Sequence, residues 1–338
     1  MRQLALVAFM ALVALGGCAN GGPGVPIGSR VDDVSLQPGD VAPFDTAAVS
    51  FLIVGDWGRN GFFNQSDVAR AMGRTGKEIS SQFTISTGDN FYVSGVESVN
   101  DVKWERSFED IYTAPALQSR WYSTLGNHDW QGSVQAQIDY TSRSDRWYQP
   151  ARYYAETIPV DDATDALFVF IDTTPLSVSE DERRNYDDAF DWTQDRQLAW
   201  LDSTLAASSA QWKIVVGHHP IYVGSTSYID NPPLIETLVP IFERNEVQAY
   251  FNGHDHNLQH HRPRGSTIDY FTSGAGSLTR GVVQTPNMLF GVRTPGFMAV
   301  SLTAKRMDVH AFDEENTLLY ATAVPLRRGE RLPLPFGL

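Results

Sequence analysis

Residues 50–58 read SFLIVGDWG, a short apolar run that stops at a glycine followed by an aspartate. The same pattern, an apolar run closed by a glycine and polar residues, recurs further along the chain. The further segments are FTISTGDNFY (83–92), WYSTLGNHD (121–129), WKIVVGHHP (212–220) and VQAYFNGHDH (247–256). Runs of this length that are rich in β-branched and aromatic residues predict strands.

Helical patterns fall between these runs. Helices are predicted at Ser66–Ser80, Lys103–Thr113, Thr193–Ala207 and Glu236–Asn245. In the third of them, Leu198, Leu201 and Leu205 follow the i, i+3, i+4 spacing of one buried helix face. Short strands that alternate with helices indicate an α/β fold.

The polar residues that close the runs are the candidate functional residues. Ligands of open α/β sheets bind beyond the carboxyl ends of the strands, so these residues are expected to converge on one cleft. Those able to bind a metal are Asp56, Asp89, Tyr92, Asn127, His218, His254 and His256. A single buried histidine is more often a core residue, and an aspartate beside glycine is often a turn residue. The joint pattern nevertheless predicts a metal site.

The chemistry that suits this set is hydrolysis by two metal ions. Ions about 3.5–4 Å apart need a shared ligand, and the carboxylate of Asp89 suits that position. Imidazole and oxygen donors favour iron, zinc or manganese over an ion that prefers thiolates. Such a pair acidifies a water into a nucleophile and binds phosphate oxygens as their charge develops.

The composition excludes several other classes of protein. The 338 residues include a single cysteine, which excludes an internal disulfide framework, a cysteine-rich zinc site and a CxxC redox motif. A formal net charge of −14 argues against a nucleic-acid polymer as partner, because such proteins present a basic face. With 42% hydrophobic residues and no internal repeat, we expect one catalytic domain at residues 47–324 and a surface tail at 325–338.

The first residues have the features of an export signal. Arg2 precedes an apolar stretch shorter than the ~20 residues that span a bilayer, so residues 1–17 are predicted to be a signal peptide. Cys18 follows Leu-Gly-Gly and resembles the lipidated cysteine of a bacterial lipobox; an ordinary secretory signal is the alternative. Residues 18–46 are rich in glycine and proline and predict a flexible tether. We therefore expect a lipid-anchored protein of the bacterial cell envelope, held at a membrane through Cys18 and facing the periplasm.

Taken together, GDWG, GDNFY, GNHD, GHHP and GHDH resemble the signature of the metallophosphoesterase (calcineurin-like) superfamily. Asp56 is followed by Trp57-Gly58 where most of that superfamily has Asp-x-His, and Tyr92 stands three residues after Asp89. These features are similar to the purple acid phosphatases, close to the small tartrate-resistant type, and the similarity covers residues 48–315. It implies a four-layer α-β-β-α sandwich with the metal site at the carboxyl ends of the strands.

The resemblance also implies a ligand set and an activity. Fe(III) would be held by Asp56, Asp89, Tyr92 and His256, and a divalent ion, Fe(II), Zn(II) or Mn(II), by Asp89, Asn127, His218 and His254. A phenol with a pKa of about 10 ionises at working pH only beside a strong Lewis acid, which trivalent iron provides. The implied activity is that of an acid phosphatase in which a metal-activated water or hydroxide attacks a phosphate monoester.

His128 resembles the outer-shell histidine of this family, which contacts the substrate phosphate and assists proton transfer to the leaving group. Its neighbour Asn127 is expected to contact the substrate as well. Asp129 is expected either to orient His128 or to stabilise the turn.

The chain departs from the family at a second outer-shell histidine. Small members carry it about nine residues after the histidine of the GHxP motif, which here is the position of Ser227, and no histidine lies between 221 and 230. His219 is a candidate substitute. His260 and His261 are expected to lie on the surface.

Two alternative functions stay open at this point. The motifs specify metals and phosphate but not the second ester substituent, so a phosphodiesterase or nucleotidase would share them. A non-catalytic phosphate-binding lipoprotein is the other alternative, supported only by the missing histidine. Residues 180–195 carry seven acidic and two basic residues, which predict a solvated loop or, as a hypothesis, a gate over the site.

Overall fold

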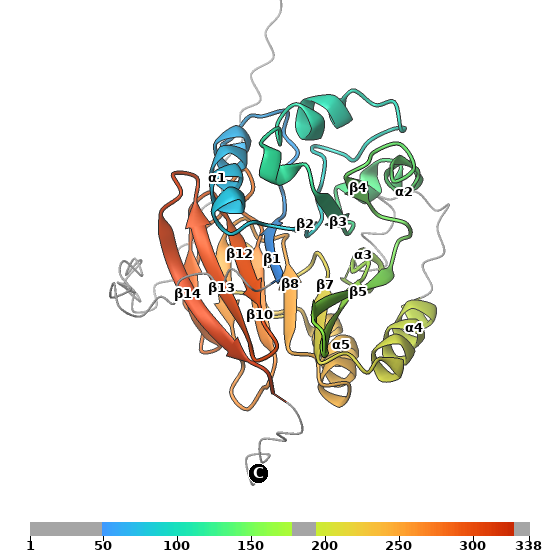
Figure 1. The fold of residues 1–338 in the computed structure, drawn as a ribbon, viewed down its shortest axis with the longest axis vertical. Helices are drawn as coiled ribbons and strands as arrows, with labels where there is room; N and C mark the ends of the chain where they lie inside the picture. Colours follow the sequence, from blue (N-terminus) through green and yellow to red (C-terminus); the bar gives the residue numbers. More distant parts are fainter. Residues whose placement is uncertain (1–48, 178–193, 328–338) are drawn as a thin grey trace, which may run out of the picture. The chain divides into compact units, whose positions relative to one another are not determined.

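The computed structural model describes residues 49–177 and 194–327, which form two seven-stranded sheets (Figure 1). In sheet order, the first contains β14 (Leu318–Pro325), β13 (Arg306–Asp313), β12 (Gly296–Leu302), β1 (Val49–Val54), β2 (Phe83–Ser86), β3 (Arg120–Ser123) and β4 (Trp147–Tyr148). The second contains β11 (Met288–Val292), β9 (Leu258–His261), β10 (Asp269–Ser273), β8 (Ala249–Asn252), β7 (Trp212–Val216), β6 (Thr164–Phe170) and β5 (Tyr154–Asp161).

Each sheet has a parallel part that carries the predicted motifs. β1 to β4 pair in parallel in the first sheet, and β6, β7, β8 and β10 pair in parallel in the second. The remaining strands add antiparallel pairs at the edges. All five motif runs are strands of these parallel parts, as the sequence predicts.

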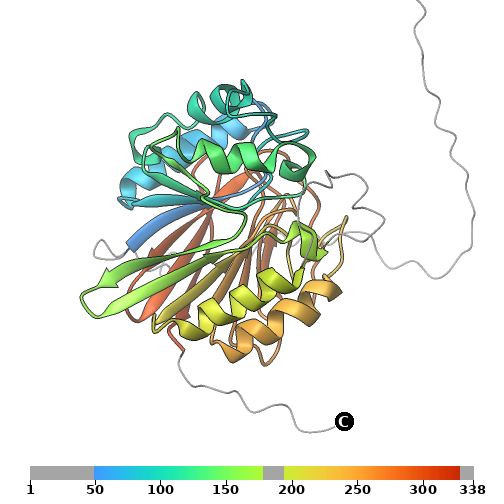
Figure 2. The ribbon, with the colours of Figure 1, turned by 90° about the vertical axis from the view of Figure 1, so that its right-hand side faces the viewer.

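Helices cover the outer face of each sheet. The helices are α1 (Gln65–Glu78) and α2 (Val134–Tyr140) on the first sheet, and α3 (Thr174–Ser177), α4 (Gln194–Ala207) and α5 (Pro232–Arg244) on the second. Short turns add η1 (Trp104–Glu109), η2 (Pro115–Leu117) and η3 (Asp129–Gln131). Figure 2 shows the two sheets lying face to face between these helical layers. The four-layer α-β-β-α prediction is therefore confirmed.

The core between the sheets is built on aromatic side chains. Phe51 of β1 stacks on Phe83 of β2 with 4.7 Å between ring centroids. Phe168 of β6 meets both rings edge-on, at 5.4 and 5.7 Å. Edge-to-face contacts of this kind stabilise a core beyond the apolar area that they bury. They hold together the two sheets whose strand ends carry the motifs.

Three of the four predicted helices are present. The predicted segments 66–80 and 193–207 correspond to α1 and α4. α5 begins four residues earlier than expected, because Asn231 caps it by accepting a hydrogen bond from the Leu234 N–H and prolines occupy its first turn. The helix predicted at Lys103–Thr113 is wrong in length and type, since only the π-helical turn η1 forms there.

The prediction that His260 and His261 lie on the surface is wrong. Both belong to β9, between β10 and β11, and are at most 1% exposed. His260 Nε2 lies 2.7 Å from the buried Asp269 carboxylate and its Nδ1 lies 2.9 Å from the Tyr320 hydroxyl. Pairing of β9 with β10 and β11 provides the burial, and side chains nine and sixty residues away provide the hydrogen bonds. Neither is visible in the local sequence.

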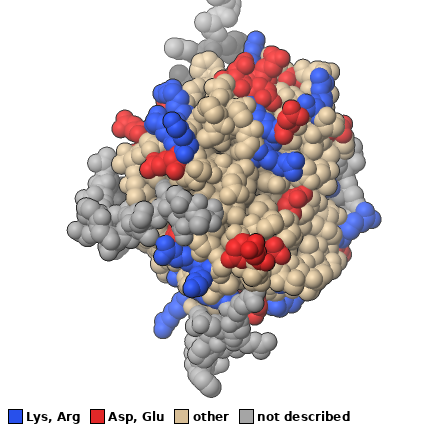
Figure 3. All heavy atoms as spheres, viewed as in Figure 1, with Lys and Arg blue, Asp and Glu red and all other residues tan. Residues whose placement is uncertain are grey.

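Several predictions fall outside the described residues. They are the signal peptide at 1–17, Cys18, the whole tether at 18–46, most of the tail at 325–338 and most of the acidic segment 180–195. Within the described ranges, no helix has the length and apolar character that a bilayer span requires. On the face seen in Figure 3, acidic and basic side chains are interspersed among uncharged ones.

We expect the substitution Phe168→Ala to lower the free energy of unfolding by about 3–5 kcal/mol, because it removes a buried ring from the core between the sheets. Phe62→Ala is the matched control, since Phe62 is 67% exposed, and should change stability by less than about 0.5 kcal/mol. Urea denaturation of both variants measures the difference, and equal effects would contradict the packing described here.

Candidate metal centre

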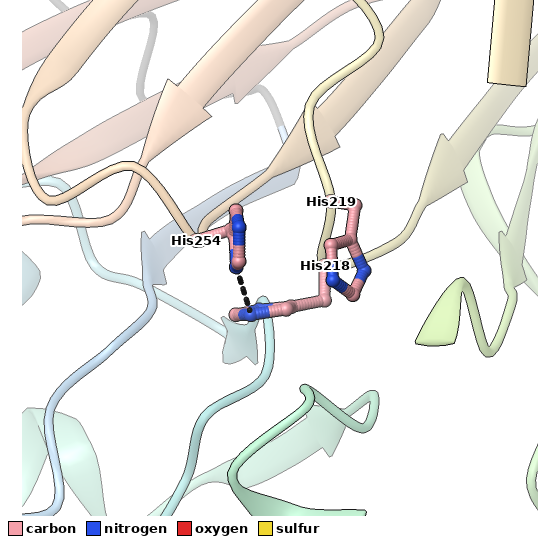
Figure 4. Close-up of side chains that lie close together, drawn as sticks. All are labelled: His218, His219 and His254. Carbon is pink, nitrogen blue, oxygen red and sulfur yellow. Dashed lines mark hydrogen bonds between the residues drawn. The ribbon is translucent and has the colours of Figure 1, made fainter. Parts of the chain in front are cut away.

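The seven predicted ligands come together where the carboxyl ends of the two parallel parts meet. Asp56 follows β1, Asp89 and Tyr92 follow β2, and Asn127 follows β3. From the second sheet, His218 follows β7, and His254 and His256 follow β8. Figure 4 shows His218 and His254 reaching toward each other from their two loops.

A first group of donor atoms surrounds the Tyr92 hydroxyl. Tyr92 Oη lies 2.9 Å from Asp56 Oδ1, 2.8 Å from Asp89 Oδ2 and 3.2 Å from His256 Nε2. His256 Nε2 lies 3.3 Å from Asp56 Oδ1. All four side chains are buried. Two carboxylates, a phenol and an imidazole thus present one donor atom each to a common point.

A second group surrounds the Asn127 side-chain oxygen. Asn127 Oδ1 lies 3.0 Å from His254 Nδ1 and 3.3 Å from His218 Nε2, and the two imidazole nitrogens are 3.2 Å apart. His218 Nε2 is also 3.4 Å from Asp89 Oδ1. Asp89 therefore belongs to both groups, with one carboxylate oxygen in each.

These spacings fit metal ions. An ion that binds its ligands at about 2.1 Å places neighbouring ligand atoms about 3.0–3.4 Å apart. The donors are oxygen and nitrogen atoms, the set that suits iron, zinc or manganese. His218 is oriented for such a role, because its Nδ1 donates to the Thr87 carbonyl at 2.9 Å and leaves the Nε2 lone pair facing the group.

The electrostatics of the buried groups also favour cations. Burial raises the pKa of Tyr92 well above its usual value, and the Asp56 and Asp89 carboxylates add to the effect. Burial alone would raise the pKa of Asp89, but His218 and His128 hold it well below its usual value. Burial opposes protonation of His218, yet Asp89 raises its pKa to about 9. The buried carboxylates thus need a positive partner, and only a strong Lewis acid would ionise the phenol.

The backbone is strained at three of the ligands. Asp56, Asp89 and His254 adopt left-handed φ angles of 61°, 49° and 67°. Such conformations cost of order 1–3 kcal/mol each and cluster at functional sites. Close approach adds a second constraint, since a Cβ on Gly126 would overlap the Asp89 carboxylate and one on Gly253 would overlap that of Asp56. The glycines of the motifs therefore let the loops approach the carboxylates.

His128 lies at the open side of the centre. Its backbone N–H donates to Asp89 Oδ1 at 2.8 Å, and its Nε2 lies 3.9 Å from Asp89 Oδ2. The ring packs on Tyr92 with 4.5 Å between centroids, and the side chain is 24% exposed. His128 is therefore not in either donor group but can reach both the centre and solvent.

Asp129 stabilises the turn rather than orienting His128. Its buried carboxylate accepts hydrogen bonds from the backbone N–H groups of Asn90 and Gly126 and from the Gln137 side-chain amide. The His128 imidazole contacts the Val93 carbonyl instead. Of the two expectations for Asp129, turn stabilisation is confirmed.

His219 lies beside the second group, with one ring nitrogen within 4.8 Å of ligand nitrogens of His218 and His254. Its Nδ1 lies 2.9 Å from the Thr173 hydroxyl, which also accepts from the backbone N–H groups of His218 and His219. The ring packs against that of His254 at 4.4 Å between centroids, and burial holds its pKa well below the usual value. Its role as a substitute proton donor stays a prediction.

Two further residues support the centre and carried no assignment in the sequence analysis. Asn90, between Asp89 and Tyr92, donates from its amide to the Thr124 carbonyl at 2.9 Å and to Gln137 at 3.0 Å. The Arg59 guanidinium lies 3.5 Å from the centre of the Tyr92 ring. Asn90 lies inside the GDNFY motif and Arg59 directly follows GDWG. The residues that they contact lie in distant segments, so the local sequence does not indicate their roles.

Comparison with known proteins identifies the family. The model of the calcineurin-like phosphoesterase family matches residues 49–258. Purple acid phosphatase 4 of Arabidopsis thaliana is 41% identical over 292 residues, which cover 82% of this chain and 84% of that protein. Tartrate-resistant acid phosphatase type 5 of Sus scrofa is 33% identical over 309 residues, covering 83% and 88%.

The chain belongs to the purple acid phosphatases. It is therefore a hydrolase, a dinuclear metal-dependent acid phosphatase that acts on phosphate esters. Purple acid phosphatases hold iron together with zinc, manganese or a second iron. Among solved structures, GAP50, the anchor in the inner membrane complex of Plasmodium, has a TM-score of 0.73 at 25% identity, covering 84% of this chain and 90% of that chain.

The purple acid phosphatase PPD1 of yellow lupin shows the shared fold. It superimposes with a TM-score of 0.62 at 13% identity, covering 82% of this chain and 54% of that chain. That protein and this chain thus share the same fold.

We expect Asp129→Ala to lower the free energy of unfolding by at least about 2 kcal/mol, because several buried donors lose their acceptor. Asp139→Ala, on the exposed face of α2, is the control and should be nearly neutral. Thermal unfolding and kcat are measured together. A fall in kcat at unchanged stability would instead mean that Asp129 orients His128.

Proposed function

We propose that this purple acid phosphatase hydrolyses phosphate monoesters at two ions held by the two donor groups. In this assignment Asp56, Asp89, Tyr92 and His256 would hold Fe(III), and Asp89, Asn127, His218 and His254 would hold Fe(II), Zn(II) or Mn(II). The observation that carries the proposal is the position of Asp89, whose two oxygens face different groups. Bound there, the ions supply an acidified water as nucleophile and neutralise phosphate charge.

The chain's own residues position the substrate. Asn127 and His128 lie side by side at the open side of the centre, where they can donate to phosphate oxygens. His128 is only part-buried, so it can exchange protons with solvent and pass one to the departing ester oxygen. The His254 backbone N–H donates to Asp56 Oδ2 at 2.8 Å, which links a ligand of the second group to a ligand of the first.

The complete donor groups favour catalysis over a non-catalytic binding role. Each of the seven predicted ligand side chains lies in at least one of the two groups, with Asp89 in both. The phosphodiesterase or nucleotidase alternative is separated by the ratio of kcat/KM on a phosphate monoester and on a diester. A preference for the diester would contradict the monoester assignment.

The assignment predicts different effects for a ligand and for an outer-shell residue. His218→Ala should remove one metal ion per chain and abolish turnover. His128→Ala should retain both ions and lower kcat by about 10²–10⁴-fold, the usual contribution of a general acid. Metal analysis and steady-state kinetics on a phosphate monoester test both variants. Full activity in His218→Ala, or metal loss in His128→Ala, would contradict the assignment.

We also propose that the enzyme is exported and held at a membrane of the bacterial cell envelope by a lipid on Cys18. The support is in the sequence, where Arg2, the apolar stretch and the only cysteine of the chain follow the order of a lipoprotein signal. The glycine- and proline-rich residues 18–46 would then separate the lipid from the catalytic domain.

Cys18→Ser is expected to move phosphatase activity from the membrane fraction to a soluble fraction, because the lipid attachment point is lost. Cell fractionation of a bacterial host, with incorporation of labelled fatty acid into the protein, measures this. The control is Ser29→Ala in the tether, which should stay in the membrane fraction. Equal fractionation of Cys18→Ser and wild type would rule out the lipid anchor.

A further inference from the structure

The position of the missing outer-shell histidine is occupied differently in this chain. Ser227 is exposed, and the next residue, Tyr228, turns its ring onto His254 of the second donor group. The ring centroids of Tyr228 and His254 are 4.5 Å apart. The Tyr228 ring therefore packs against a ligand of the second group, one residue after the position at which the family resemblance implies a histidine.

Arg280 lies against the same side. Its Nη1 donates to the Tyr228 hydroxyl and to the His254 carbonyl, the latter at 3.1 Å. Its backbone N–H donates to the His256 carbonyl at 2.7 Å. The guanidinium is thus bound to the turn that carries two ligands, so its positive charge lies beside the second donor group.

The two residues are held together by their segments. Residues 224–226 and 281–283 pair through backbone hydrogen bonds, with Thr226 N donating to Gly281 O and Val283 N to Gly224 O, both at 3.1 Å. The Ser225 hydroxyl also donates to Asp255 at 3.0 Å. The hydroxyl and the guanidinium therefore have defined positions, which is the condition for recognising a ligand with little loss of entropy.

Both residues keep donors for a ligand. Within residues 49–177 and 194–327, no carboxylate forms an ion pair with Arg280, and its Nε and Nη2 groups donate to no acceptor. The Tyr228 hydroxyl accepts from Arg280, and in the same ranges its own proton has no acceptor. A phosphate dianion needs both a permanent positive charge and hydrogen-bond donors.

We propose that Arg280 and Tyr228 bind the substrate phosphate on the His254 side of the centre, in place of the absent outer-shell histidine. The inference rests on the proposed function, since it concerns the same substrate at the same centre. Arg280 attracts and orients the phosphate, and the Tyr228 hydroxyl donates to one of its oxygens. His128 donates from beside Tyr92 of the first donor group.

The test uses the metal-loaded enzyme and inorganic phosphate as a competitive inhibitor of monoester hydrolysis. Tyr228→Phe keeps the ring against His254 and removes only the hydroxyl, and Arg280→Gln removes the charge. Each should raise the inhibition constant of phosphate and KM by about tenfold or more, the effect of losing a hydrogen bond to a charged group. Metal content should stay at the wild-type level in both.

The matched controls are Tyr222→Phe, from the same loop but with its ring against Tyr270, and Arg264→Gln on an exposed turn. Neither should change the inhibition constant. If Arg280→Gln loses metal, Arg280 only supports the ligand turn, and the proposal that it binds phosphate fails. The inhibition constant of Tyr228→Phe then tests by itself whether the Tyr228 hydroxyl binds phosphate. An unchanged inhibition constant in Tyr228→Phe and in metal-loaded Arg280→Gln overturns the proposal.

These outcomes are distinct from failure of the proposed function. If the proposed function is wrong, the wild type itself will neither hydrolyse the monoester nor be inhibited by phosphate. If only the present inference fails, the wild type stays active and inhibited by phosphate, and the variants resemble it.

Discussion

The Asp89 carboxylate is the group on which the rest of the site depends. Its Oδ2 lies 2.8 Å from the Tyr92 hydroxyl and its Oδ1 lies 3.4 Å from His218 Nε2, so one side chain joins both donor groups. This requires that a strand end of the first sheet meet a strand end of the second. The aromatic core between the sheets, with Phe168 against Phe51 and Phe83, holds these ends in place.

The geometry around Asp89 is costly, and the surrounding structure stabilises it. Left-handed backbone at Asp56, Asp89 and His254 would be unfavourable in an isolated loop. Here the loops are joined by buried hydrogen bonds, such as those of Asp129 to Asn90 and Gly126, and by backbone bonds such as Asp56 N to Gly88 O at 3.0 Å. Rigid support of this kind fixes ligand positions before any ion binds.

The strands, the cleft and the ligands could be predicted because their signals are local. Each apolar run ends in a glycine and a polar ligand, and parallel strands bring such ends together. Other features depend on distant contacts. The burial of His260 comes from pairing with β10 and from Asp269, and the short turn η1 replaces a longer predicted helix. The pairing of Tyr228 with Arg280 joins residues 52 positions apart, which no spacing rule indicates.

The difference between the net charge of the chain and the local charge at the site explains how an acidic chain binds an anionic substrate. The formal charge of −14 describes the whole sequence. The charge that a substrate meets at the site depends instead on the cations that its buried carboxylates require. Around them, Arg280 and Arg59 bring positive charge to the two donor groups from different loops. Local charge at the centre, and not net charge, therefore decides which substrate can bind.

The central claim is that Asp89 joins two metal ions, one of them an iron bound by the Tyr92 phenolate. Metal analysis of the purified protein, combined with a visible absorption spectrum of wild type and of Tyr92→Phe, tests it most directly. The account predicts two ions per chain, at least one of them iron, and a visible charge-transfer band that disappears in Tyr92→Phe. One ion per chain, or a colourless and active protein without iron, would contradict it.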